Sequence, residues 1–201
     1  TLTLTTFTFA TNLVVNGDLE LWDDATHPTG WTKVENIDQE STIVNGGSYS
    51  AKHTGGTKDL GQYIDVIAGH SHTLSINFSI EYNDGTDGRL WSYWKDASGS
   101  SINDNASELR LYMTDNGDDW GSYSTTVTAP EGAAQLYLEV RTYSNAVVYW
   151  DDFSLIDNDA GGGGDTCDDA AACNNGSEGD CTYPNTNYDC NGDCTAETGT
   201  G

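Results

Sequence analysis

The stretch Thr73 to Tyr82, TLSINFSIEY, alternates apolar and polar side chains along its whole length. One face would carry the apolar members, Leu74, Ile76, Phe78, Ile80 and Tyr82. The other face would carry Thr73, Ser75, Asn77, Ser79 and Glu81. A period of two is typical of a β-strand with one buried face. The stretch therefore predicts a strand in the wall of a sandwich or barrel.

Two further segments show the same alternation. Residues 135–143 would place Leu136, Leu138 and Val140 inward, and Tyr137, Glu139, Arg141 and Tyr143 outward. Residues 89–95 would place Arg89, Trp91 and Tyr93 opposite Leu90 and Trp94. Both segments are interpreted as strands of the same domain.

Turn signals separate short apolar runs between Asn12 and Ile156. They are Asn16-Gly17-Asp18, Pro28-Thr29-Gly30, Asn45-Gly46-Gly47, Asn83-Asp84-Gly85, Asn116-Gly117-Asp118 and Pro130-Glu131-Gly132. This spacing favours a sandwich or barrel over alternating strands and helices, and no amphipathic helix of convincing length interrupts it. The predicted fold is all-β. Large aromatic side chains assigned to its core are Trp31, Trp94, Trp120, Trp150 and Phe78.

The charge balance narrows the possible partners. The 201 residues include Asp+Glu 32 against Lys+Arg 7, a formal net charge of −25. Such a field repels phosphate backbones and anionic lipid heads, so we expect neither nucleic acid nor a membrane as partner. Neutral glycans and divalent cations are better candidates, although the acidity is equally consistent with solubility alone.

Composition divides the chain into four segments. Residues 1–10 are interpreted as the remnant of a secretory signal, with a strand as the alternative. Residues 11–157 form the predicted sandwich domain, and residues 158–166, with Gly161 to Gly164, form a flexible Gly/Asp linker. Residues 167–201 form a small, irregular Asp/Cys-rich tail that contains all five cysteines, Cys167, Cys173, Cys181, Cys190 and Cys194.

The tail has too little apolar content for a core of its own, so disulfides or a metal must hold it if it is ordered. An oxidising environment predicts a secreted or extracellular-surface protein, and the odd number of cysteines predicts a partner cysteine beyond Gly201. The cysteine spacing does not match a zinc finger.

Four motifs carry a resemblance to a known group. They are NLVVNGDLE at 12–20, PTGW at 28–31, GSYSAK at 47–52 and VYWDDFSL at 148–155. In order and spacing, residues 12–156 resemble the jelly-roll carbohydrate-binding modules related to families 4, 9, 16 and 22. The resemblance implies a jelly-roll β-sandwich of two antiparallel sheets. It also implies a polysaccharide or oligosaccharide ligand and a linked domain beyond the C-terminus. The tail is similar, in composition and short spacing, to Asp/Cys-rich segments of large secreted proteins from marine Bacteroidetes.

The resemblance also implies a structural calcium ion. Its implied ligands are Glu20 and Asp151 or Asp152, with Asp18 close by and backbone carbonyls of residues 46–50. Strand parity places Asp151 with Phe153 and Leu155 on the buried face, where an ionised carboxylate needs a cation or several donors, so Asp151 is preferred. The alternative is a group of solvated carboxylates at the sandwich edge.

The Asp-rich stretch near the tail also resembles the calcium-loaded loops of thrombospondin type 3 repeats. Its members are Asp157, Asp159, Asp165, Asp168 and Asp169. No complete EF-hand loop is present, and a solvated acidic linker pinned by disulfides is the alternative.

Sugar binding is predicted where aromatic rings alternate with hydrogen-bonding side chains, because a ring can stack on the C–H face of a pyranose while neighbours meet its hydroxyls. Parity brings candidates from three strands, taken as adjacent, to one surface. They are Asn77, Glu81, Arg89, Trp91, Tyr93, Tyr137, Glu139 and Arg141. Ordinary sandwich aromatics and surface ion pairs are the alternative. Glu81, Glu139 and the overall charge weigh against highly sulfated or uronic-acid polymers, because like charges repel, although calcium bridging could reverse this.

Catalysis is not expected. The four histidines, His27, His53, His70 and His72, lie in turn-like settings, and no catalytic motif is present. Tyr137 with Arg141 is the closest approach to the base and neutraliser of a polysaccharide lyase. The predicted function is a non-catalytic polysaccharide-binding module that targets an attached secreted enzyme or surface protein to glycan. The alternative is a calcium-stabilised structural or adhesive module without a sugar ligand.

Overall fold

The computed structural model describes residues 11–81, 88–104, 106–113, 119–160, 170–177, 181–184 and 188–191. The chain divides into two compact units, Phe9–Asn158 and a second one made of Thr1–Thr8 with Asp159–Gly201. Several predictions concern residues outside the described ranges. They are the signal remnant at 1–10, Tyr82, the turns at 83–85 and 116–118, the glycines 161–164, Asp165, Asp168, Asp169, Cys167 and Cys194.

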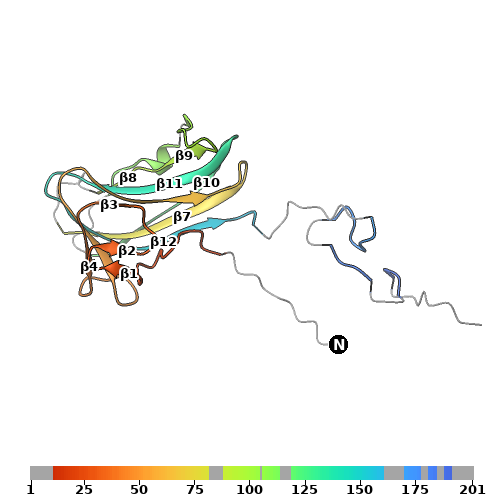
Figure 1. Cartoon of the computed structure of the whole chain (residues 1–201), viewed down its shortest axis with the longest axis horizontal. Helices are drawn as coiled ribbons and strands as arrows, with labels where there is room; N and C mark the ends of the chain where they lie inside the picture. Colours follow the sequence, from red (N-terminus) through yellow and green to blue (C-terminus); the bar gives the residue numbers. More distant parts are fainter. Residues whose placement is uncertain are drawn as a thin grey trace, which may run out of the picture. The chain divides into compact units, whose positions relative to one another are not determined.

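The larger unit is an all-β sandwich of two antiparallel sheets, as predicted (Figure 1). The first, called the β7 sheet, has the strand order β10-β7-β12-β5-β4. Its strands are β4 Ile37–Glu40, β5 Ser50–Thr54, β7 Ser71–Ile80, β10 Gly121–Thr128 and β12 Val147–Asp157. Its longest strand pairs, β7 with β12 and β7 with β10, join segments far apart in the sequence.

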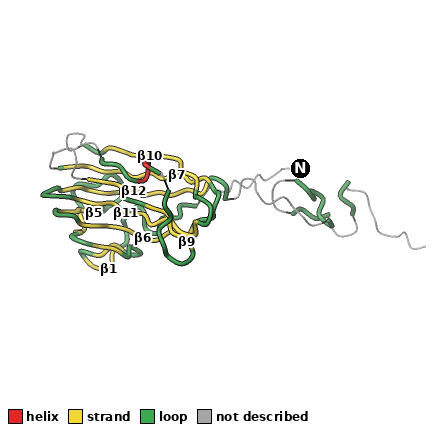
Figure 2. Tube along the Cα trace, turned by 90° about the horizontal axis from the view of Figure 1, so that it is seen from above, coloured by secondary structure: helices red, strands yellow, loops and turns green. Residues whose placement is uncertain are grey.

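The second, called the β11 sheet, has the order β3-β6-β11-β8, and β9 also pairs with β11. Its strands are β3 Lys33–Val34, β6 Lys58–Asp65, β8 Gly88–Leu90, β9 Tyr93–Asp96 and β11 Ala133–Thr142. A small hairpin of β1 Trp22–Asp24 with β2 His27–Pro28 and a 3-10 turn at Ser107–Leu109 complete the described elements. Seen from above, the long strands run side by side (Figure 2).

The alternation seen in the sequence is confirmed in β7 and β11, but residues 89–95 form two short strands instead of one. The interruption falls at Trp91 and Ser92. The Trp91 backbone N–H donates to the Glu139 carbonyl, whereas the Ser92 N–H donates to the Leu109 carbonyl. Successive N–H groups of a strand point to opposite sides, so these two bonds do not mark a change of partner. The register with β11 is the same before and after the break, and Arg89, Trp91 and Tyr93 therefore share one face.

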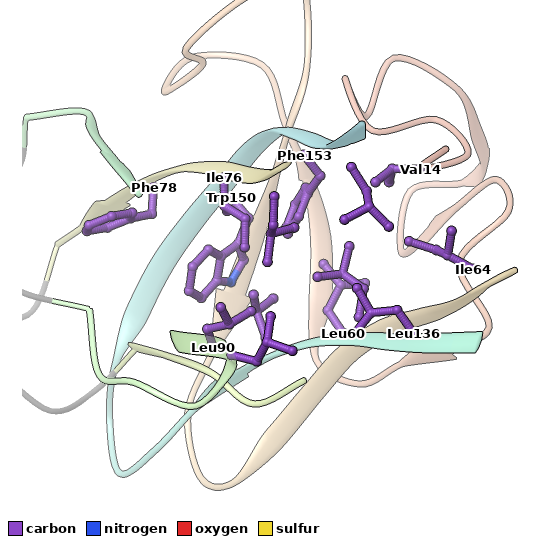
Figure 3. Close-up of a cluster of buried hydrophobic side chains, with 14 of the residues drawn as sticks. Val14, Leu60, Ile64, Ile76, Phe78, Leu90, Leu136, Trp150 and Phe153 are labelled. Atoms are coloured by element: carbon purple, nitrogen blue, oxygen red, sulfur yellow. The ribbon is translucent and has the colours of Figure 1, made fainter. Parts of the chain in front are cut away.

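The core lies between the two sheets, where side chains from both inner faces meet (Figure 3). Ile76, Trp150 and Phe153 of the β7 sheet point toward Leu60 and Leu136 of the β11 sheet. The predicted core aromatics Trp31, Phe78, Trp94 and Trp150 are buried in this cluster. Trp120 is wrong as a core residue: it is only partly buried, because it precedes the edge strand β10 instead of facing the opposite sheet.

The domain begins and ends at neighbouring backbone positions. Asn12 forms an antiparallel bridge with Ile156, and the Leu13 N–H donates to the Leu155 carbonyl at 2.8 Å. The Asn12 amide adds a hydrogen bond to the Phe153 carbonyl at 2.9 Å. Within the described residues, no helix has the length and apolar character needed to span a membrane.

The second unit contains a disulfide between Cys173 and Cys190, which are 17 residues apart. Cys181 is disulfide-bonded as well. Cross-links of this kind restrict the unfolded chain and so stabilise segments with little core, and they fit an extracellular setting.

Shortening a core side chain should destabilise the sandwich strongly. Leu138 is 0% exposed and Leu21 is 61% exposed. We expect Leu138→Ala to lower the free energy of unfolding by about 2–5 kcal/mol, through lost burial and the cavity left behind. Leu21→Ala, the matched control, should change it by less than about 0.5 kcal/mol. Urea denaturation of both variants checks this, and equal effects would contradict the assigned core.

Candidate functional site

An aromatic row crosses the outer face of the β11 sheet. Tyr137 of β11 is directly opposite Tyr63 of β6 on one side and Tyr93 of β9 on the other. The ring centroids are 4.6 Å apart for Tyr63 and Tyr137, and 5.2 Å apart for Tyr93 and Tyr137. Tyr137 is 5% exposed, whereas Tyr63 is 49% exposed. The central ring is therefore covered by its neighbours, while Tyr63 presents its ring to solvent.

A glycine makes room for this row. Gly61 of β6 lies beneath the Tyr137 ring, and a β-carbon at that position would come 2.7 Å from the Leu138 carbonyl oxygen and 3.1 Å from the Tyr137 hydroxyl. Real β-carbons do not approach other atoms that closely, so a side chain here would displace the strand or the ring. Gly61 is thus required for the close approach of Tyr137 to the sheet.

A buried ionic group lies beside the aromatic row. Glu139 is only 2% exposed, and its carboxylate accepts a hydrogen bond from Nε of Arg141. The same Nε lies 3.0 Å from Oδ1 of Asp59, which is on the neighbouring strand. Burial is the main cause that raises the pKa of the Glu139 carboxyl, and Arg141 opposes it. Burial, followed by the Glu139 charge, raises the pKa of the Tyr137 and Tyr93 hydroxyls.

Cationic groups lie over several rings of this face. The Arg89 guanidinium carbon is 3.8 Å from the Trp91 ring centroid and 4.5 Å from that of Tyr112. The Arg141 guanidinium carbon is 5.2 Å from the Trp91 centroid. Lys95 Nζ lies 5.4 Å from the Tyr93 centroid and 5.8 Å from that of Tyr63. These distances are within the range of cation–π attraction, so the charged groups and the rings hold one another in place.

Six of the eight predicted ligand-binding residues therefore belong to one sheet. They are Arg89, Trp91, Tyr93, Tyr137, Glu139 and Arg141, carried by β8, β9, β11 and the residues between β8 and β9. The residues on this face that the sequence reasoning missed are Asp59, Gly61, Tyr63, Lys95 and Tyr112. The sequence did contain a signal for Asp59, Gly61 and Tyr63. In KDLGQYID at 58–65, these three residues alternate with inward-facing positions of a strand.

The placement of Asn77 and Glu81 on the same surface is wrong. Asn77 lies in β7 and Glu81 directly follows that strand, which pairs with β10 and β12 of the opposite sheet. Asn77 donates to Oδ2 of Asp152 at 3.1 Å, and Glu81 accepts from the Tyr149 hydroxyl at 2.6 Å. Parity predicts which face of a strand a residue occupies, but it does not predict the sheet to which the strand belongs.

Three of the predicted metal-ligand residues surround one loop. Oδ2 of Asp151 accepts from the backbone N–H groups of Asn45 and Gly46 at 2.9 and 3.2 Å. Oε1 of Glu20 accepts from those of Ser48 and Tyr49 at 2.8 and 3.0 Å.

Asp152 joins this group through Oδ2, which accepts from the Asn45 side-chain amide at 2.6 Å. The opening motif and the last strand are therefore both tied, through carboxylates, to residues 45–49.

Asp151 is buried as predicted, but the reason given by strand parity is wrong. Trp150 faces the core, so Asp151 points away from it, and the register with β7 shifts between Asp151 and Ser154. Asp152 has a positive φ of 49° at this bulge, which returns Phe153 and Leu155 to the core. Burial, opposed by N–H donors from Asn45 and Gly46, raises the Asp151 pKa to about 6. Asp18 is exposed and takes no part in the hydrogen bonds described for this group.

Comparison with known proteins gives fold relatives only. No family model and no curated protein matches the chain. A family 16 carbohydrate-binding module shares 22% identity over 73% of this chain and 100% of its own, with a TM-score of 0.56. A family 22 xylan-binding domain of Paenibacillus barcinonensis Xyn10C shares 16% identity over 75% of this chain and 97% of its own, with a TM-score of 0.54.

Two other structures extend the comparison. A family 61 carbohydrate-binding module in complex with β-1,4-galactotriose shares 13% identity over 74% of this chain and 100% of its own, with a TM-score of 0.52. The enzymatically active domain of the bacteriophage CBA120 tailspike protein 4 shares 15% identity over 72% of this chain, but only 21% of its own, with a TM-score of 0.57. At these identities the likeness establishes the jelly-roll sandwich fold.

The buried Glu139 should give stability a specific pH dependence. Its folded-state pKa is raised, so its contribution is favourable below the pKa of the unfolded chain and is lost as pH rises through the folded value. The free energy of unfolding of the wild type, relative to Glu139→Gln, should therefore fall as pH rises above about 4. Urea denaturation across this range measures the difference, with the exposed Glu131→Gln as control. A difference that does not vary with pH would refute the assignment.

Proposed function

We propose that the sandwich domain is a non-catalytic polysaccharide-binding module, and that the outer face of the β11 sheet is its binding face. The observation that carries this proposal is the aromatic row Tyr63–Tyr137–Tyr93, with Trp91 beside it, flanked by hydrogen-bonding side chains. Aromatic faces bury the C–H surface of a pyranose, while polar neighbours meet its hydroxyls. The row contains several rings, so it suits an extended saccharide.

The exposure of the rings supports a binding role over simple packing. Tyr63 and Tyr112 are both exposed, although each lies in a cluster of other rings on the same face. Gathered exposed apolar surface is more often an interaction site than scattered single residues are. Three of the fold relatives named above are carbohydrate-binding modules, which is consistent with this interpretation.

The surroundings of Tyr137 and Arg141, the two residues that most resemble the base and neutraliser of a polysaccharide lyase, support a non-catalytic role. Burial and the adjacent Glu139 charge raise the pKa of Tyr137, so its hydroxyl holds its proton firmly. Arg141 is engaged by Glu139 and Asp59 and so has no free charge with which to stabilise an anionic intermediate. A general base must have a pKa near the working pH. The pKa of the Tyr137 hydroxyl is instead shifted further above that pH.

A tethering role completes the proposal. A module of this kind raises the effective concentration of a linked domain on its polysaccharide. The disulfides of the second unit suit an extracellular setting, in which such targeting takes place.

We further propose that Glu20, Asp151 and Asp152 hold a structural calcium ion. The residues fit the ion chemically, because they offer several carboxylate oxygens, and calcium takes six to eight oxygen ligands. In the described part of the chain, none of the three carboxylates forms an ion pair with a cationic side chain, although Asp151 is fully buried. When bound, calcium would supply the missing positive charge and join the opening motif to β12.

Removing the exposed ring of the row should weaken glycan binding. We expect Tyr63→Ala to lower the affinity for a bound polysaccharide by about tenfold, equivalent to about 1.4 kcal/mol of stacking. A panel of neutral and acidic polysaccharides, tested by affinity electrophoresis and calorimetry, identifies the ligand and measures the loss.

The control for this test is Tyr188→Ala, because Tyr188 in the second unit is also 49% exposed. It should bind as the wild type does, and Tyr63→Ala should remain folded at the temperature of the binding assay. Absence of binding to every polysaccharide in the panel would refute the proposed function.

Calcium should stabilise the sandwich through the carboxylate group. We expect the melting temperature to rise on adding calcium to chelator-treated protein, because a ligand of the folded state stabilises it in proportion to its saturation. Asp151→Asn and Glu20→Gln should abolish most of this rise, whereas Asp18→Asn should leave it intact. Differential scanning calorimetry measures it, and an unchanged rise in the first two variants would place calcium elsewhere.

A further inference from the structure

We propose that the glycan recognised by the β11 sheet carries carboxylate groups, and that Arg89 and Lys95 receive them. This inference rests on the proposed function and specifies its substrate class as a uronic-acid-containing polysaccharide. Two observations carry it: the distribution of the few basic residues, and the contacts that these two side chains make.

The basic residues of this acidic chain are concentrated on the proposed binding face. The chain has seven Lys and Arg against 32 Asp and Glu. Four of the seven belong to outward positions of the β11 sheet or its edge, namely Lys33, Arg89, Lys95 and Arg141. The same face also carries the carboxylates Asp59, Asp65 and Glu139, so its charges are close to balance, unlike those of the whole molecule.

Two of these four cations are already neutralised. Lys33 Nζ lies 2.6 Å from Oε1 of Glu35, and Arg141 is paired with Asp59 and Glu139. Among the residues that the structure describes, Arg89 and Lys95 form no ion pair. With more than four carboxylates for each basic residue in the chain, a cation that pairs with none of them is unexpected. Both instead lie against aromatic rings of the binding face.

Arg89 is held with its hydrogen-bond donors incompletely used. Its guanidinium lies over both the Trp91 and Tyr112 rings, at 3.8 and 4.5 Å from their centroids. Its Nε is buried without a hydrogen-bond partner, and one terminal nitrogen makes a 3.4 Å hydrogen bond to the Tyr112 hydroxyl. The buried Nε is out of reach of a ligand, so a carboxylate would be received by the terminal nitrogens, whose planar arrangement matches its two oxygens.

Lys95 supplies a second positive charge on this face, beside the Tyr93 and Tyr63 rings. It donates to the Gly99 carbonyl at 2.8 Å, which uses one of its three donors. Arg89 is opposite Arg141 and Lys95 is opposite Gln135 on β11, six residues apart. At the strand rise this separation is about 20 Å, which a chain of several sugars spans but a single sugar does not.

Negative charge on remote surfaces does not oppose this assignment, and the nearby Asp65 accepts a hydrogen bond from Gln135 at 2.8 Å. Electrostatic interactions are screened within about 8 Å at physiological ionic strength, so carboxylates on remote surfaces have little influence on a bound group. Glu139 is buried against Arg141, and Glu81 belongs to the opposite sheet. The two carboxylates that weighed against acidic polymers in the sequence therefore do not face the ligand as free charges.

The test compares ligands that differ only in charge. Galacturonan oligosaccharides and their fully methyl-esterified forms share one backbone, and glucuronoxylan with unsubstituted xylan gives a second such pair. We expect the full chain to bind the acidic member of at least one pair about tenfold more tightly than its neutral counterpart. Arg89→Gln should remove most of that preference and Arg89→Lys a part of it. Lys95→Gln should reduce the preference as well.

The control is Lys52→Gln, because Lys52 lies on β5 of the opposite sheet beside the Tyr149 ring. Equal affinity for acidic and neutral members, unaffected by Arg89→Gln, would overturn the inference and leave the proposed function intact. Arg89-dependent binding to a sulfated galactan, without binding to uronates, would overturn the carboxylate assignment. Failure to bind any glycan, acidic or neutral, would overturn both the inference and the proposed function.

Discussion

Strand β11 is buried on both of its faces, and the rest of the domain depends on that constraint. Its inward residues, among them Leu136 and Leu138, pack in the core, while Tyr137 and Glu139 are covered on the outer face by neighbouring strands. A strand buried on both sides cannot shift its register without placing a charge in the core. The core and the proposed binding face are therefore fixed by the same ten residues.

The fold could be predicted from the sequence because its signals are local. Alternation in β7 and β11 and the turn residues between the strands identified an all-β sandwich, which the structure confirms. The predictions failed where contacts between distant parts of the chain determine the local structure. A break in the ladder at Trp91 and Ser92 divides one expected strand into two, although both parts pair with β11 in the same register. The position of Trp120 before the edge strand β10 keeps it out of the core.

The candidate site was predictable in part, for a related reason. Parity correctly grouped Tyr137, Glu139 and Arg141 on one face, but it could not assign β7 to the opposite sheet, so Asn77 was grouped with them in error. The bulge at Asp152 changes which residues of β12 face the core, and no local sequence pattern predicts it. Pairing between strands distant in sequence is the information that a single sequence does not contain.

The bridge between Asn12 and Ile156 has a mechanical consequence. Because the segment at Asn12 and Leu13 runs antiparallel to the end of β12, a force that pulls these two ends apart loads the hydrogen bonds one after another instead of all at once. Peeling of this kind needs less force than sliding two strands past each other, and here it would begin at the bonds made by Asn12 and Leu13. Under a force applied to its two ends, the domain would thus yield first where its chain enters and leaves.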